Sequence, residues 1–179
     1  NLFFLLYNLK GDFFIKTKQY NKAFIAFEKS LEFIKSKSKR VMMYSKLSII
    51  SESIQEFNKS INYLDKIQIT SNDKEIRVES FRKWLDIMKK IEFNDKIIIR
   101  IQEKLNSPDF DTKILQDELK IELAIAYMKK GNFSDSKNIF NNIIETSAQK
   151  KIKSQSYYWL GYISLYYEFN IDLALEYFN

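Results

Sequence analysis

The stretch LAIAYMKKGNFSDSKNIFNNI, which runs from Leu123 to Ile143, decides the fold. Its first part sets the small residue Ala124 among large apolar side chains at helical spacing and ends at Gly131. A second apolar segment begins at Phe133 and places Phe140 on the same helical face. Because glycine adopts left-handed backbone geometry at little cost, a glycine between two such segments predicts two helices joined by a tight turn.

This arrangement resembles the tetratricopeptide repeat, whose pattern is W-x-x-L-G-x-x-Y followed by G-x-Y-x-x-A-x-x-x-F-x-x-A. In that family the small residue after Leu lets the two helices of a pair cross closely, and large aromatic side chains fill the space beside the pair. The resemblance implies an all-α protein, a right-handed α-solenoid of antiparallel helix pairs. The length of this chain then predicts about five pairs.

Two further stretches of the chain fit the same pattern. The matching residues are Tyr7, Gly11, Phe14, Tyr20, Ala23 and Phe27 at the start, and Leu160, Gly161, Ala174 and Phe178 at the end. All three glycines therefore occupy repeat positions, Gly11 and Gly161 at a helix crossing and Gly131 at a turn. The first stretch departs from the pattern at Lys10 and at Lys18, which stands where the family has its turn glycine.

Two weaker units lie between these stretches. The residues that we take as equivalent are Tyr20, Phe57, Phe93, Phe133 and Ile171, at steps of 37, 36, 40 and 38 residues. We therefore predict a single repeat domain over residues 1–179, with units at about 4–37, 41–70, 77–105, 117–147 and 154–179. Pro108 falls between the third and fourth units, where a helix must end. An irregular helical bundle is the alternative fold.

The composition argues against the common kinds of catalytic site and metal site. Only 3 Gly and 1 Pro occur in 179 residues, which favours long helices over a β-rich fold. The chain has no Cys and no His, so thiol nucleophiles, imidazole bases and the usual zinc ligands are absent. We interpret Asp109 with Asp111 as a loop and Glu118 with Glu122 as surface charge. The sequence therefore predicts no enzyme, no cofactor and no metal site.

The charge pattern gives the alternative function. Lys+Arg exceed Asp+Glu by 6, and a run of cations spans Lys35 to Arg40, with a smaller cluster at Lys150, Lys151 and Lys153. A cluster of this kind can contact phosphate, so the alternative is a basic helical adaptor on nucleic acid or an anionic membrane surface. Both clusters fall at predicted connections between units, which makes nucleic acid the weaker choice. The apolar run from Leu2 to Leu9 is too short to cross a membrane.

The resemblance also predicts a binding groove, because the first helix of each pair lines the concave side in this family. The ligand-facing positions of the last three units are Phe81, Leu85, Met88, Ile121, Ile125, Met128, Tyr158, Tyr162 and Leu165. An apolar stripe of this kind fits a helix or an extended segment of a partner protein. Equally, these side chains could belong to the core. Some members of the family clamp a carboxylate with Lys and Asn, but the first two units offer Asn8, Asp12, Ser45 and Ile49 instead.

Both ends of the chain are apolar, with Leu2 to Leu6 at one end and Tyr177 and Phe178 at the other. These ends would belong to a longer array, dock on a partner, or pair with a second copy. Because the chain begins at Asn1, we expect it to be part of a longer protein. We predict a non-enzymatic protein-interaction scaffold from a bacterium, in the cell envelope or the cytoplasm.

Overall fold

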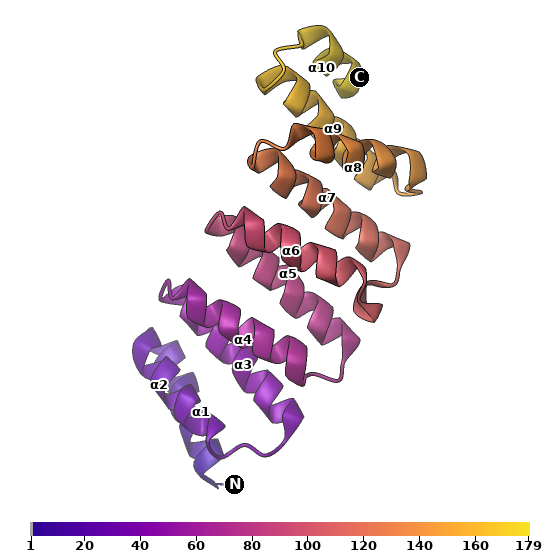
Figure 1. The fold of residues 1–179 in the computed structure, drawn as a ribbon. Helices are drawn as coiled ribbons and strands as arrows, with labels where there is room; N and C mark the ends of the chain where they lie inside the picture. The colour runs from indigo at the N-terminus through magenta and orange to yellow at the C-terminus, as the bar shows by residue number, and fades with distance from the viewer. Residues whose placement is uncertain (1) are drawn as a thin grey trace. The chain divides into compact units, whose positions relative to one another are not determined.

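The computed structural model describes residues 2–179, and within them it contains ten α-helices, one 3-10 helix and no strand (Figure 1). The helices are α1 (Leu2–Lys16), α2 (Tyr20–Leu31), α3 (Lys37–Ser53), α4 (Phe57–Thr70), α5 (Lys74–Lys90), α6 (Asn94–Leu105), η1 (Pro108–Phe110), α7 (Lys113–Lys129), α8 (Phe133–Thr146), α9 (Lys150–Tyr166) and α10 (Ile171–Phe178). The predicted all-α class with about five helix pairs is confirmed. None of these helices combines the length and the apolar character that crossing a bilayer requires.

The chain divides into two compact units, one up to Ile87 and one from Met88 to Asn179. In the first unit α1 packs on α2, α2 on α3, and α3 on α4. In the second unit α6 packs on α7, α7 on α8, α8 on α9, and α9 on α10. Both α2 and α8 thus lie against the first helix of their own pair and against the first helix of the pair that follows. The prediction of a single domain stays a prediction.

The turns inside the helix pairs share one backbone conformation. The second residue after the first helix has a positive φ at Lys18 (56°), Gln55 (61°), Glu92 (58°) and Gly131 (78°). In each turn the next amide donates back to a carbonyl five residues earlier, as from Asn132 to Tyr127 at 3.0 Å. This pair of features is the Schellman motif, which satisfies the last carbonyls of a helix. Lys18 therefore takes the backbone position of the turn glycine, as predicted.

The fifth turn differs from these four because its connection is one residue longer. The left-handed residue there is Phe169, with φ 54°, and the amide of Asn170 donates to the carbonyl of Ser164 at 2.8 Å. The Asn170 side chain then accepts from the amide of Leu173 at 3.0 Å and caps α10.

The helix crossings explain the two remaining glycines. A Cβ atom on Gly11 would lie 2.3 Å from Cε1 of Phe27, and one on Gly161 would lie 2.5 Å from Cε1 of Phe178. Each glycine lets the aromatic ring of the second helix rest directly on the backbone of the first. The predicted crossing positions are confirmed at both sites.

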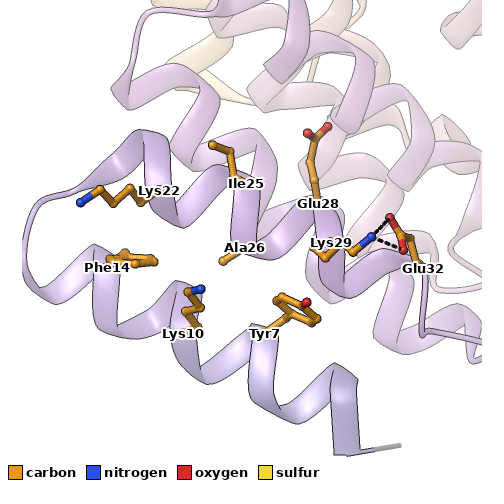
Figure 2. A pocket seen from close by; sticks show the side chains of 9 residues that line it. All are labelled: Tyr7, Lys10, Phe14, Lys22, Ile25, Ala26, Glu28, Lys29 and Glu32. Carbon is orange, nitrogen blue, oxygen red and sulfur yellow. Dashed lines mark hydrogen bonds and ion pairs between the residues drawn. The ribbon is translucent and has the colours of Figure 1, made fainter.

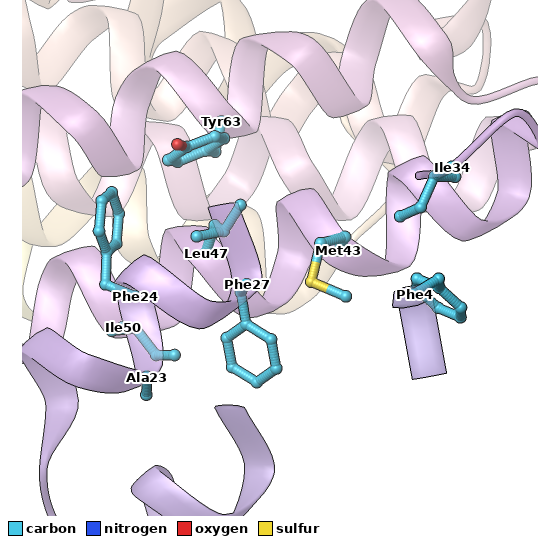
Figure 3. Close-up of a cluster of buried hydrophobic side chains, with 9 residues drawn as sticks. All are labelled: Phe4, Ala23, Phe24, Phe27, Ile34, Met43, Leu47, Ile50 and Tyr63. Atoms are coloured by element: carbon cyan, nitrogen blue, oxygen red, sulfur yellow. The ribbon is translucent and has the colours of Figure 1, made fainter. Parts of the chain in front are cut away.

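Each unit has its own apolar core. In the first unit the core cluster consists of Phe4, Ala23, Phe24, Phe27, Ile34, Met43, Leu47, Ile50 and Tyr63 (Figure 3). In the second unit it consists of Ile121, Ala124, Met128, Phe140, Ile143, Ile152, Leu160 and Ile163. Burying one large apolar side chain contributes about 1.5–3 kcal/mol, so these clusters supply the main stabilisation of each unit.

The first helices of the later pairs begin earlier than the sequence units suggest. α3 starts at Lys37, α5 at Lys74, α7 at Lys113 and α9 at Lys150, three or four residues before the predicted starts. At the predicted break between the third and fourth units, the short helix η1 begins at Pro108.

Candidate functional site

The candidate site is the face that α7 and α9 form together in the second unit. These two helices are the first members of consecutive pairs and pack against each other. Of the predicted groove residues on them, Ile121 and Met128 are buried core side chains. Ile125, Tyr162 and Leu165 are half-buried, and Tyr158 is 52% exposed. The face therefore offers four of the six predicted residues on these helices to a ligand.

The predicted groove residues of the third unit lie in the interior. Phe81, Leu85 and Met88 are at most 4% exposed. The prediction assumed that one side of each first helix stays open. Neighbouring side chains cover this part of α5 instead, so these three residues contribute to packing. The candidate site therefore consists of Ile125, Tyr158, Tyr162 and Leu165.

A connected set of aromatic rings extends the site beyond the predicted residues. Tyr158, Tyr162 and Tyr166 are four residues apart and line one face of α9. The ring centroids of Tyr158 and Tyr162 are 6.5 Å apart, and those of Tyr162 and Tyr166 are 4.6 Å apart. We call these three residues the tyrosine stripe.

Four further rings support the tyrosine stripe. Trp159 makes edge contacts with Tyr158 at 5.2 Å and with Tyr162 at 5.5 Å. Tyr167 contacts Tyr162 at 6.1 Å and the ring of Phe133, at the start of α8, at 4.5 Å. Phe178 of α10 lies 6.1 Å from Tyr158. Trp159, Tyr167 and Phe178 thus contact the stripe directly, and Phe133 supports Tyr167, so ring contacts restrict the side chains of the stripe.

Ion pairs connect α7 and the end of α9 to neighbouring helices of the second unit. Lys89 Nζ donates to Glu122 Oε1 at 2.9 Å. Lys137 forms an ion pair with Glu168. No group of three or more Asp and Glu residues within residues 2–179 is placed to hold a metal ion.

Several solved structures share this architecture over nearly the whole chain. MamA is 17% identical, with a TM-score of 0.64, over 98% of this chain and 88% of its own. The apo form of RapI is 14% identical, with a TM-score of 0.68, over 97% of this chain and 67% of its own. YrrB, described as a TPR protein with an unusual peptide-binding site, is 14% identical, with a TM-score of 0.57, over 96% of this chain and 80% of its own. This chain has the tetratricopeptide-repeat fold. No family model matches its sequence, and no curated protein is significantly similar to it.

Two of the residues predicted at the clamp positions, Asn8 and Asp12, bind each other and Lys46 of α3. Lys46 Nζ donates to Asn8 Oδ1 at 2.9 Å and to Asp12 Oδ1 at 2.6 Å. Asn8 Nδ2 also donates to Asp12 Oδ2 at 3.3 Å. Because the ammonium and the amide already have partners, this cluster is not prepared for a carboxylate ligand.

The basic run of the first unit also has structural roles. Lys39 Nζ lies 5.3 Å from the ring centroid of Phe4. Arg40 Nε donates to the backbone carbonyl of Ile34 at 3.1 Å. The run leads into α3, which begins at Lys37, and part of it therefore fastens the connection between the first two pairs.

Proposed function

We propose that this chain is a protein-interaction scaffold that binds an apolar segment of a partner protein along the tyrosine stripe. The contacting residues are Tyr158, Tyr162 and Tyr166 on α9, with Ile125 on α7 and Leu165 at the edge. The observation that carries the proposal is the accessible, pre-positioned stripe. Tyr158 and Tyr166 are 52% and 58% exposed, although each is held by neighbouring rings.

The chemistry of the stripe indicates what it binds. Tyrosine offers a large rigid contact area at a low cost in conformational entropy, and its hydroxyl can hydrogen-bond a main-chain group of the ligand. Rings on one helix face, one helical turn apart, suit the apolar side of a helix or an extended proline-containing segment. The stripe itself contains no charged side chain, so it gives no reason to expect a strongly charged ligand. The likeness to YrrB agrees with peptide binding, since YrrB is described as having a peptide-binding site.

The test uses a phage-displayed library of random peptides panned against the chain. Affinities of the selected peptides are then measured by fluorescence anisotropy. We expect Tyr158→Ala with Tyr162→Ala to weaken binding about tenfold or more, as expected for central aromatic anchors. Tyr157→Ala is the matched control, because Tyr157 is an exposed tyrosine on the same helix whose ring contacts Tyr177. Equal binding by the double variant and the wild type would refute the proposal.

The basic-adaptor alternative predicts a different salt dependence. Binding through phosphate contacts falls steeply between low and high salt, whereas apolar contacts on the stripe persist. Peptide binding that survives about 0.5 M salt therefore supports the tyrosine stripe. Binding of a short DNA or RNA duplex at low salt that is lost at high salt would favour the alternative.

A further inference from the structure

The face of α9 that carries the tyrosine stripe continues toward the beginning of the helix. Successive residues of a helix are rotated by about 100°, so Lys151 and Gln155 lie within about 40° of Tyr162 around the axis, as Tyr158 and Tyr166 do. α9 is one unbroken helix over this stretch, and both Lys151 and Gln155 are exposed. We call these two residues the polar extension of the stripe.

The same face is accessible on α7, which packs against α6, α8 and α9. Ile114 and Lys151 are the second residues of α7 and α9, and Ile125 and Tyr162 are the thirteenth, so these pairs of residues are equivalent. Ile114 is 53% exposed and Ile125 is half-buried. The face thus stays accessible on a first helix that has neighbouring helices before and after it.

Lys151 has no ion-pair partner and no ring partner in the part of the chain that the structure describes. Lysines beside the hollow of about 740 Å³ between α1 and α2 differ in this respect (Figure 2). There Lys29 pairs with Glu32 at 2.8 Å, and Lys10 Nζ lies 6.0 Å from the ring centroid of Phe14. The ammonium of Lys151 is therefore available to a carboxylate of a ligand.

The uncharged polar groups of this face are also without partners. Within residues 2–179, no side-chain hydrogen bond involves the Gln155 amide or the hydroxyls of Tyr158, Tyr162 and Tyr166. An amide and a phenol can each donate and accept a hydrogen bond. A helical ligand keeps its backbone groups bonded internally, whereas an extended segment presents free N–H and C=O groups. This row of polar groups therefore favours an extended ligand.

The spacing of residues along α9 sets the spacing of side chains in such a ligand. At 1.5 Å per residue, Lys151 lies about 10 Å from Tyr158 along the helix, and Tyr158 lies about 6 Å from Tyr162. An extended chain covers about 3.3 Å per residue, so these intervals correspond to about three and two ligand residues. Two residues is also the interval at which side chains of an extended chain return to the same face.

We propose that the tyrosine stripe and its polar extension bind an extended segment that is both apolar and acidic; this inference rests on the proposed function. Two apolar side chains of the segment, two residues apart, contact Tyr158 and Tyr162. An Asp or Glu of the segment, three residues away from the apolar residue on Tyr158, pairs with Lys151. The apolar pair supplies most of the affinity, and the ion pair fixes the register of the segment along α9.

Lys151→Glu tests the ion pair, and Lys153→Glu is the matched control. Lys153 lies about 180° around the helix axis from Tyr162, so its substitution makes the same change of charge on the opposite face of α9. Both substitutions place an acidic residue in or near the first turn of the helix, where it is favourable. Both variants should therefore fold, and circular dichroism checks that each keeps its helix content.

The probes are the peptides that panning selects on the wild-type chain, and fluorescence anisotropy measures their affinities. We expect these peptides to share an acidic residue three positions from a pair of apolar residues that are two positions apart. Lys151→Glu should weaken their binding about tenfold, and Lys153→Glu should change it by less than about twofold. A peptide whose acidic residue is replaced by lysine should bind the wild type more weakly and the Lys151→Glu variant more tightly.

Different results would overturn different parts of the reasoning. If Tyr158→Ala with Tyr162→Ala weakens binding but Lys151→Glu does not, the stripe is a binding site and the ion pair is excluded. An interval of about seven residues between the acidic and the apolar residues, which a ligand helix alongside α9 would need, would exclude the extended geometry. Peptide binding that does not depend on Tyr158 and Tyr162 would overturn the proposed function and this inference together.

Discussion

The contact between Gly11 and Phe27 predicts that the smallest enlargement of the glycine will destabilise the first unit. In Gly11→Ala the new Cβ would lie 2.3 Å from Cε1 of Phe27 and 2.6 Å from both Cδ1 and Cζ. Phe27 is 0% exposed and belongs to the core of the unit, so its ring has no free space to enter. α1 and α2 must therefore move apart or the ring must leave its preferred rotamer.

Two opposing terms set the size of this effect. Alanine is favoured over glycine inside a helix by about 1 kcal/mol. Overpacking a well-filled core costs about 1–3 kcal/mol, and a clash with a fully buried ring belongs in the upper part of that range. We therefore expect Gly11→Ala to lower the free energy of unfolding by about 1–2 kcal/mol.

Gly161→Ala is the matched comparison, because its Cβ would lie 2.5 Å from Cε1 of Phe178. Phe178 is 46% exposed, so its ring can turn into solvent and relieve the clash. The gain in helix propensity then offsets the lost contact, and the net change should stay within about 0.5 kcal/mol.

Urea denaturation followed by circular dichroism measures both changes, and hydrogen exchange assigns the loss in Gly11→Ala to α1 and α2. Adding Phe27→Leu should make Gly11→Ala less costly, with a coupling of about 1 kcal/mol in the double-mutant cycle. A Gly11→Ala chain as stable as the wild type, or a cycle without coupling, would refute the close-crossing explanation.

The remaining predictions concern the turns, one buried carboxylate and one tyrosine. Gln55→Gly should raise the free energy of unfolding by about 0.5–1 kcal/mol, because φ is 61° at that position. Gly131→Ala should lower the free energy of unfolding by about 1 kcal/mol, because φ is 78° there. Urea denaturation that gives the opposite signs would contradict the turn assignment. Lys113→Ala should lower the free energy of unfolding by about 1–3 kcal/mol, because it leaves the fully buried Asp117 carboxylate without the ammonium 2.8 Å away. The same change in an Asp117→Asn background should lower it much less. Burial, together with a hydrogen bond to a glutamate, raises the pKa of Tyr63 in the folded chain. The unfolded chain therefore loses this proton at a lower pH than the folded chain does, and the free energy of unfolding falls as pH rises above about 10. Tyr63→Phe should make that alkaline fall shallower in a pH series of unfolding measurements, and an equal slope would exclude the effect.

The repeat framework could be predicted from the sequence because it depends on local rules. Tyr20, Phe57, Phe133 and Ile171 each begin a second helix, as their spacing indicated, and Phe93 directly precedes one. Most of the turns could not be recognised from the sequence, because their left-handed residue is not a glycine. Only Gly131 marked a left-handed residue, since Schellman hydrogen bonds hold non-glycine residues in that conformation elsewhere.

The binding face was harder to predict, because exposure depends on which helices lie next to a residue. Phe81 and Met128 have the same helical spacing as accessible groove residues, yet neighbouring side chains bury both. Tyr166 was missed because the family frame assigns only three ligand-facing positions to each first helix. The interval of four residues from Tyr162 was the signal that could have found it. Trp159 has no such signal, since its role is to support the tyrosine stripe.

The contrast between the two units argues for where recognition takes place. In the first unit the polar groups of Asn8, Asp12 and Lys46 satisfy one another, so a ligand would have to break an ion pair of 2.6 Å before gaining new contacts. In the second unit the tyrosine stripe is already ordered by ring contacts and exposes apolar area with free hydroxyl groups. A ligand on the stripe gains apolar burial without displacing a protein–protein ion pair. For this reason we expect segment binding to the stripe, while the charges of the first unit hold its helices together.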